Sequence, residues 1–138
     1  MKPLPRLDDT DRLVLLVDDE PTVARAHARM LRRYARLGTE VCCSPLRALE
    51  RIAAGERFDA VVCDGQMPGL DGVAFFLRAS AFWPDLEHRF VFLSGGLRGE
   101  RREFVGERCL ISFTKPLHGE HREAFVAVVR GLAHLPHS

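Results

Sequence analysis

The feature that most constrains the fold of this chain is an alternation of short apolar runs with longer segments of helical spacing. The apolar runs cover residues 13–17, 39–43, 59–63, 89–93 and 109–113. Apolar runs of this length, bounded by polar residues and glycines, predict strands. The first, third and fourth runs are almost continuously apolar, which is typical of strands covered on both faces.

The segments between these runs carry apolar residues three or four positions apart, which predicts helices with one buried face. The residues assigned to these faces are Val23, Ala26, Met30, Leu31 and Tyr34, then Leu46, Leu49 and Ile52, then Val73, Phe76 and Leu77, and finally Phe125, Val128, Val129 and Leu132. A weaker fourth helix is expected over residues 97–106, where glycines lower the helix propensity. Strands and helices that alternate in this way form βα units joined by right-handed crossovers. The sequence therefore predicts an α/β fold with a doubly wound, five-stranded parallel sheet.

The size and composition of the chain favour one ordinary globular domain over residues 1–138. The 138 residues match the usual length of a single domain. We expect a core over about residues 11–134 and frayed termini, at residues 1–10 and in the last four residues. Hydrophobic residues make up 46% of the chain and charged residues 28%, and the net charge is +1, which argues against disorder and against a nucleic-acid partner.

No segment of the sequence predicts contact with a membrane. No apolar run approaches the ~20 residues that a membrane-spanning helix needs. The first residues, "MKPLPRLDDTDR", also lack the apolar centre of a signal peptide. We therefore expect a cytoplasmic protein.

The cysteines are expected to be buried, reduced thiols rather than disulfides or zinc ligands. Cys42, Cys43, Cys63 and Cys109 all lie in the apolar runs, and no two of them form a C-x-x-C pair. Zinc sites generally need closer ligand spacing than these residues have.

Polar side chains follow four of the five predicted strands, and they carry the functional prediction. They are Asp18 and Asp19 after the first strand, Asp64 after the third, Ser94 after the fourth and Lys115 after the fifth. Because the carboxyl ends of parallel strands meet at one edge of a sheet, these side chains are expected to converge there. Three neighbouring carboxylates repel one another and need a cation. Carboxylate oxygens without soft ligands favour Mg²⁺.

Such a site suits the transfer of a phosphoryl group. A carboxylate beside Mg²⁺ can attack phosphorus as a nucleophile and form an acyl phosphate. The transition state spreads negative charge over the transferred group, so a cation and hydrogen-bond donors stabilise it. In this interpretation Asp64 is the nucleophile, Lys115 is the cation and Ser94 supplies a hydroxyl donor.

Four motifs resemble those of the receiver domain of two-component response regulators, the CheY-like family. They are "LLVDDEP", "VVCDGQMPGLDG", "FLSGG" and "FTKP", in the order that the family shows. The resemblance covers about residues 11–134. It implies a flavodoxin-like (βα)5 fold with strand order 2-1-3-4-5.

The resemblance also implies a function. Asp64 would accept a phosphoryl group from a phosphohistidine on a histidine kinase or histidine phosphotransfer protein. Mg²⁺ would be bound by the Asp19 and Asp64 side chains and the Gln66 backbone carbonyl, with Asp18 helping through water. Lys115 and Ser94 would contact the phosphoryl group. Such a protein catalyses its own phosphorylation and dephosphorylation and turns over no separate substrate. Phosphorylation would change its affinity for a downstream protein target. It would be a monomer or a weak dimer.

One residue departs from the family pattern. Receivers usually carry an aromatic switch residue three positions before the lysine, and here that position is Ser112. Phe113 is next to it and should point to the other face of the strand, because side chains alternate along a strand. This chain therefore lacks the aromatic switch residue at the position where receivers usually carry it.

Two alternative functions stay open on the sequence. Ser112 is compatible with a binding module that works without phosphorylation. A haloacid-dehalogenase-like phosphatase would also use an aspartyl intermediate, but it needs a second acid where this chain has Gln66. The remaining polar motif residues have structural explanations: Asp71 is expected to cap a helix, and His118 and His121 are expected to be solvated. Whether the chain acts alone or as the receiver of a hybrid histidine kinase is not decided by these motifs.

Overall fold

The computed structural model describes residues 9–137 and contains one five-stranded parallel sheet with the strand order β2-β1-β3-β4-β5. The strands are β1 (Asp9–Val17), β2 (Leu37–Cys42), β3 (Ala60–Cys63), β4 (Phe90–Ser94) and β5 (Ile111–Thr114). This topology confirms the predicted flavodoxin-like α/β fold. Residues 1–8, which belong to the N-terminal segment expected to fray, lie outside the described residues.

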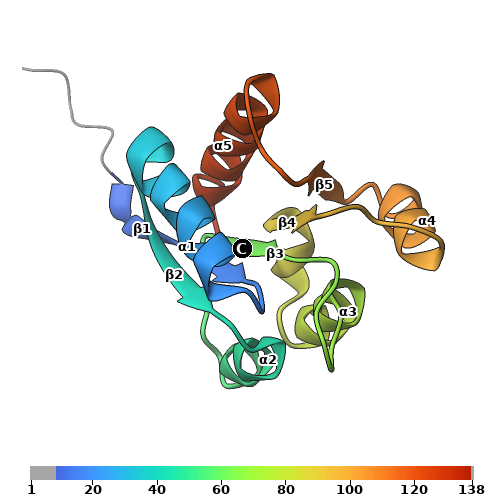
Figure 1. Ribbon diagram of the computed structural model, residues 1–138. Coiled ribbons are helices and arrows are strands. Elements are labelled where there is room, and N and C mark those ends of the chain that lie inside the picture. Colours follow the sequence, from blue (N-terminus) through green and yellow to red (C-terminus); the bar gives the residue numbers. More distant parts are fainter. Residues whose placement is uncertain (1–8, 138) are drawn as a thin grey trace, which may run out of the picture.

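Five α-helices connect and cover the strands (Figure 1). They are α1 (Pro21–Met30), α2 (Pro45–Ala53), α3 (Gly72–Phe82), α4 (Glu100–Glu107) and α5 (Glu120–Ala133). A π-helical turn, η1 (Leu31–Ala35), extends α1, and a 3₁₀ turn, η2 (Pro84–His88), follows α3. Within residues 9–137, none of the helices is both long and apolar enough to cross a membrane.

The sheet separates two hydrophobic cores, because successive strand residues point to opposite faces. Leu15 and Val61 face one core, which α2, α3 and α4 cover. Their neighbours Leu16 and Val62 face the other, which α1, η1 and α5 cover. Each of the three central strands is buried on both faces, which explains why its sequence is almost continuously apolar.

The helical spacing identified the helices but misplaced part of their buried faces. Four residues assigned to those faces are exposed: Ala26, Tyr34, Leu46 and Leu77. In α1 and α2 the sheet is contacted instead by small residues, Ala24, Ala28 and Ala48, which are at most 2% exposed. Small side chains let a helix approach the sheet closely, so the larger apolar residues beside them are left at the edge of the contact.

The prediction that all four cysteines are buried is wrong for three of them. Cys63 in β3 is buried, whereas Cys42 is partly exposed, and Cys43 and Cys109 are exposed. β2 ends at Cys42 and β5 begins only at Ile111, so Cys43 and Cys109 lie in connections outside the sheet. All four thiols are free, as predicted.

A buried arginine forms hydrogen bonds with the segment that follows α5. Arg89 is 1% exposed. Its guanidinium donates to the carbonyl oxygens of Leu135 at 3.0 Å and Pro136 at 2.7 Å, and to the Asp85 carboxylate at 2.8 Å. Beside it, His137 Nε2 lies 2.9 Å from Asp59 Oδ1. The Arg89 side chain, just before β4, therefore supplies hydrogen-bond donors to two backbone carbonyls of the last four residues, for which the sequence predicts fraying.

Replacing Arg89 by Met should lower the free energy of unfolding by about 2 kcal/mol, because several partly buried acceptors lose a charged donor. Chemical denaturation measures the change. The control is Arg51→Met, which removes a partly exposed arginine from its pairs with Glu40 and Glu56 and should cost less than about 1 kcal/mol. Equal losses for the two variants would contradict the structural role given to Arg89.

Candidate functional site

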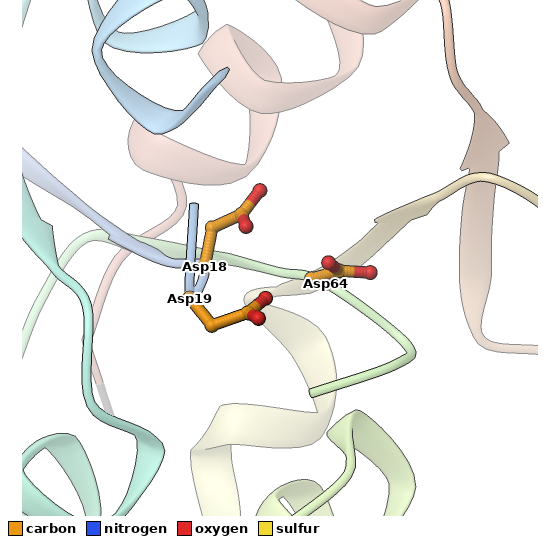
Figure 2. Close-up of side chains that lie close together, drawn as sticks. All are labelled: Asp18, Asp19 and Asp64. Atoms are coloured by element: carbon orange, nitrogen blue, oxygen red, sulfur yellow. The ribbon is translucent and has the colours of Figure 1, made fainter. Parts of the chain in front are cut away.

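Three carboxylates gather at one edge of the sheet, at the carboxyl ends of the central strands. Asp18 and Asp19 follow β1, and Asp64 follows β3. One carboxylate oxygen from each of the three lies within 4.8 Å of the others. Figure 2 shows the three side chains leaving neighbouring strand ends and gathering in one place.

The register of β1 and β3 explains why residues so distant in sequence meet. Val17, the last residue of β1, is paired with Cys63, the last residue of β3. The Asp64 backbone N–H donates to the Val17 carbonyl oxygen at 2.9 Å, which fixes the position just beyond the two strand ends. The two acids therefore emerge side by side. Pro21 then begins α1 and turns the chain away from the site.

Lys115 supplies the positive charge at this edge. Its Nζ lies 2.9 Å from Asp18 Oδ2 and 3.5 Å from Asp64 Oδ2. The Lys115 backbone N–H donates to the Ser94 carbonyl oxygen at 2.7 Å, so the residue is held beside the end of β4. The peptide bond to Pro116, whose isomer the sequence could not decide, is cis.

Ser94 and Gln66 complete the rim of the site. Ser94 is the last residue of β4, is 1% exposed, and its Oγ accepts a hydrogen bond from Gly96 N at 3.4 Å. Gln66 N donates to Asp64 Oδ1 at 3.1 Å, and the Gln66 side-chain amide donates to the Gly96 carbonyl oxygen at 3.4 Å. The hydrogen bond between Gln66 and Gly96 thus connects the loop after β3 with the loop after β4, next to Ser94.

Two further expectations about motif residues are confirmed. Asp71 caps α3, because its Oδ1 accepts from Ala74 N at 2.9 Å. His118 and His121 are exposed. Asp71 also forms an ion pair with Arg101 of α4 at 3.5 Å, which ties the start of α3 to α4.

Ser112 and Phe113 point to opposite faces of β5, as predicted. Ser112 is exposed. Phe113 packs edge-on against Phe125 of α5, with ring centroids 5.6 Å apart. The only aromatic side chain of β5 therefore belongs to the core on the α5 side of the sheet.

The electrostatics of the cluster favour binding of a divalent cation. Burial raises the pKa of Asp64, and the nearby charges of Asp18 and Asp19 raise it further, while the Gln66 N–H and Lys115 oppose the rise. One lysine faces three carboxylates, so the cluster keeps an excess of negative charge. Its ligand atoms are all carboxylate oxygens, which suit a hard ion such as Mg²⁺.

The raised pKa of Asp64 gives a prediction for the metal-free protein. A carboxyl group whose pKa is higher in the folded state opposes folding while it is ionised, and this penalty disappears as the pH falls through the folded-state pKa. In EDTA at neutral pH, Asp64→Asn should therefore raise the free energy of unfolding, by about 1 kcal/mol. The gain should shrink as the pH is lowered. Denaturation curves for both proteins across this pH range test the prediction, and a gain that grows toward acid pH would contradict it.

Sequence reasoning missed two residues that border the site. His27 of α1 is buried on the inner side of the cluster; it lies on the same helical face as Ala24 and Leu31, and that spacing could have found it. Gly72 begins α3, and its N–H donates to the Gly65 carbonyl oxygen at 3.2 Å, in the loop after Asp64. Gly72 is the last residue of the motif "VVCDGQMPGLDG", but the motif alone assigned it no role of its own.

The fold is shared with solved receiver domains. The non-phosphorylated HemR receiver domain from Leptospira biflexa superposes with a TM-score of 0.73 at 21% identity, over 92% of this chain and 98% of that one. A CheY-like receiver domain protein from Methanospirillum hungatei JF-1 gives 0.70 at 18% identity, over 88% and 93%. An uncharacterized protein from Neptuniibacter caesariensis gives 0.73 at 28% identity, over 91% of each chain.

Sequence comparison gives the same family. The hydrogenase transcriptional regulatory protein HoxA from Bradyrhizobium diazoefficiens is 35% identical over 72 residues, which are 52% of this chain and only 14% of that relative. The sequence profile of the response regulator receiver domain matches residues 14–95, which include Asp18, Asp19, Asp64 and Ser94. With the parallel sheet of order 2-1-3-4-5, this match shows that the chain belongs to the family of response regulator receiver domains.

Proposed function

We propose that this chain is a phosphoacceptor domain in which Asp64 receives a phosphoryl group from a phosphohistidine of a histidine kinase or a histidine phosphotransfer protein. The observation that carries the proposal is the meeting of Asp18, Asp19, Asp64 and Lys115 at one sheet edge. It gives a nucleophile, a cation and a metal-binding set within a side chain's reach of one another.

The transfer step needs no further reactant. A carboxylate oxygen of Asp64 attacks phosphorus, the phosphorus–nitrogen bond of the phosphohistidine breaks, and the imidazole leaves with the electron pair. The product is an acyl phosphate on Asp64. Lys115 Nζ, which lies 3.5 Å from Asp64 Oδ2, is placed to stabilise the negative charge that the phosphoryl oxygens carry. The Ser94 hydroxyl, at the end of β4, would supply a further hydrogen-bond donor.

The acidic cluster would hold Mg²⁺ through Asp18, Asp19 and Asp64, together with the Gln66 backbone carbonyl. When bound, the ion neutralises excess negative charge and so reduces the repulsion that an incoming phosphate meets. Asp18 also keeps Lys115 in place, because it accepts the shorter of that lysine's two ion pairs, at 2.9 Å.

Phosphorylation would change the affinity for a downstream protein by shifting the protein between two conformations. Position 112 carries an exposed serine, and the ring of Phe113 packs on the other face of β5 against Phe125. No aromatic ring is therefore available at position 112 to transmit this change. We propose that the β4–α4 loop, which is joined to Gln66 through Gly96, transmits it instead.

The test is labelling with acetyl phosphate, with Mg²⁺ and with EDTA. We expect one phosphoryl group per chain by mass spectrometry, dependent on Mg²⁺ and released by hydroxylamine as an acyl phosphate is. Peptide mapping should place it on Asp64. Labelling that persists in EDTA, or that maps to another residue, would overturn the proposal. Identical partner binding by the wild type and Asp64→Ala would instead favour a module that works without phosphorylation.

A further inference from the structure

A buried histidine lies directly behind the acidic cluster, and within residues 9–137 it has no hydrogen-bond partner. His27 is 9% exposed, and neither of its ring nitrogens makes a hydrogen bond with any part of the chain that the structure describes. Its ring lies near that of Phe125, with centroids 6.4 Å apart. A buried polar group without a partner costs about 1–3 kcal/mol, so an unpartnered imidazole at this position needs an explanation.

The explanation lies in a small cavity that is lined by His27 together with Asp18 and Asp64, two acidic residues of the site. The cavity has a volume of about 10 Å³, and its polar lining residues are Asp18, His27 and Asp64. The rest of its wall is apolar and includes Ala24, Val62 and Leu93. This is about the space that one water molecule requires, and buried waters typically make about three hydrogen bonds. The three polar residues offer that number of partners.

We propose that this cavity binds one structural water, which accepts a hydrogen bond from the His27 imidazole and donates one to each of the Asp18 and Asp64 carboxylates. His27 is then a positioning residue: it does not touch the phosphoryl group, but it holds the two carboxylates in place from inside the protein. Each carboxylate oxygen can accept more than one hydrogen bond, so the bonds from Glu20 N to Asp18 and from Gln66 N to Asp64 are retained.

The charge state of the imidazole fits this arrangement. Burial lowers the pKa of His27, and the nearby Lys115 lowers it further, against the opposing effect of Asp18. A neutral imidazole carries one N–H donor, which is what a bridging water needs from it. An apolar side chain at position 27 would leave the carboxylates as the only polar groups of the wall, and the link between α1 and the cluster would be lost.

The inference deepens the proposed function, and two variants test it. His27→Phe keeps an aromatic ring against Phe125 but has no nitrogen, whereas His27→Gln keeps a donor and an acceptor. We expect His27→Phe to slow Mg²⁺-dependent labelling of Asp64 by acetyl phosphate about tenfold, as the loss of an outer hydrogen-bond partner of a metal site typically does. His27→Gln should restore the rate to within about twofold of the wild type. Thermal unfolding confirms that both variants are folded.

A crystal structure of the wild type and of His27→Phe completes the test. We expect an ordered water within hydrogen-bond distance of a His27 nitrogen and of the Asp18 and Asp64 carboxylates in the wild type, and none in His27→Phe. An empty wild-type cavity, or an unchanged labelling rate in a folded His27→Phe, would overturn the inference. If the wild type is not labelled at all, the proposed function fails, while the presence or absence of the water still decides whether the bridge exists.

Discussion

Asp64→Asn is expected to abolish labelling by acetyl phosphate, with no phosphoryl group detected on the chain. The amide of asparagine lacks the anionic oxygen that attacks phosphorus. It has nearly the same size as the carboxylate and can still accept the hydrogen bond from Gln66 N, which is 3.1 Å long in the wild type. The loss would therefore report chemistry rather than a change of fold. Intact-protein mass spectrometry over a time course with Mg²⁺ measures it.

The matched control is Asp71→Asn, which makes the same replacement seven residues further along the chain. Asp71 caps α3 and is absent from the carboxylate cluster. Asparagine caps a helix about as well as aspartate, so this variant should fold and be labelled within about twofold of the wild-type rate. Persistent labelling of Asp64→Asn, with the label on another residue, would disprove the assignment of the nucleophile.

Gly72→Ala is expected to destabilise the protein by about 3 kcal/mol or more, because the added methyl group has no space. A Cβ at Gly72 would press into the Asp64 carbonyl oxygen and lie 2.9 Å from the Gly65 Cα. Both neighbours are backbone atoms, so the loop after β3 has to move. Because that loop starts at the phosphoacceptor, labelling of the folded fraction should also slow. Chemical denaturation and labelling kinetics measure the two effects.

Gly131→Ala provides the comparison, since it adds the same methyl group to another helical glycine. A Cβ at Gly131, in α5, meets nothing within 4 Å. Here alanine should raise the free energy of unfolding, by up to about 1 kcal/mol, through its better helix propensity. If the free energy of unfolding changed with the same sign in the two variants, the close contact between Gly72 and the Asp64 backbone would not be what excludes alanine at position 72.

The predicted site residues show how far strand order alone can place side chains. Asp18, Asp64 and Lys115 were predicted to meet because each follows a parallel strand, and the ion pairs of Lys115 with both acids bear out this convergence. Their roles in phosphoryl transfer stay proposals. The helix faces were predicted less well: Leu46 and Leu77 are exposed although their spacing is helical, because spacing does not say how closely a helix approaches the sheet.

The sequence by itself determined the order of strands and helices, the burial of the central strands on both faces, and the edge at which the acids, the hydroxyl and the lysine gather. These follow from local apolar patterns and from the fact that all strands of a parallel sheet end on the same side. Only the tertiary structure decided three other features: the guanidinium of Arg89 bonded to the carbonyls of Leu135 and Pro136, the lack of space at Gly72, and His27 behind the carboxylates. Each depends on the distance between atoms that are far apart in the chain, and no local pattern of residues records such a distance.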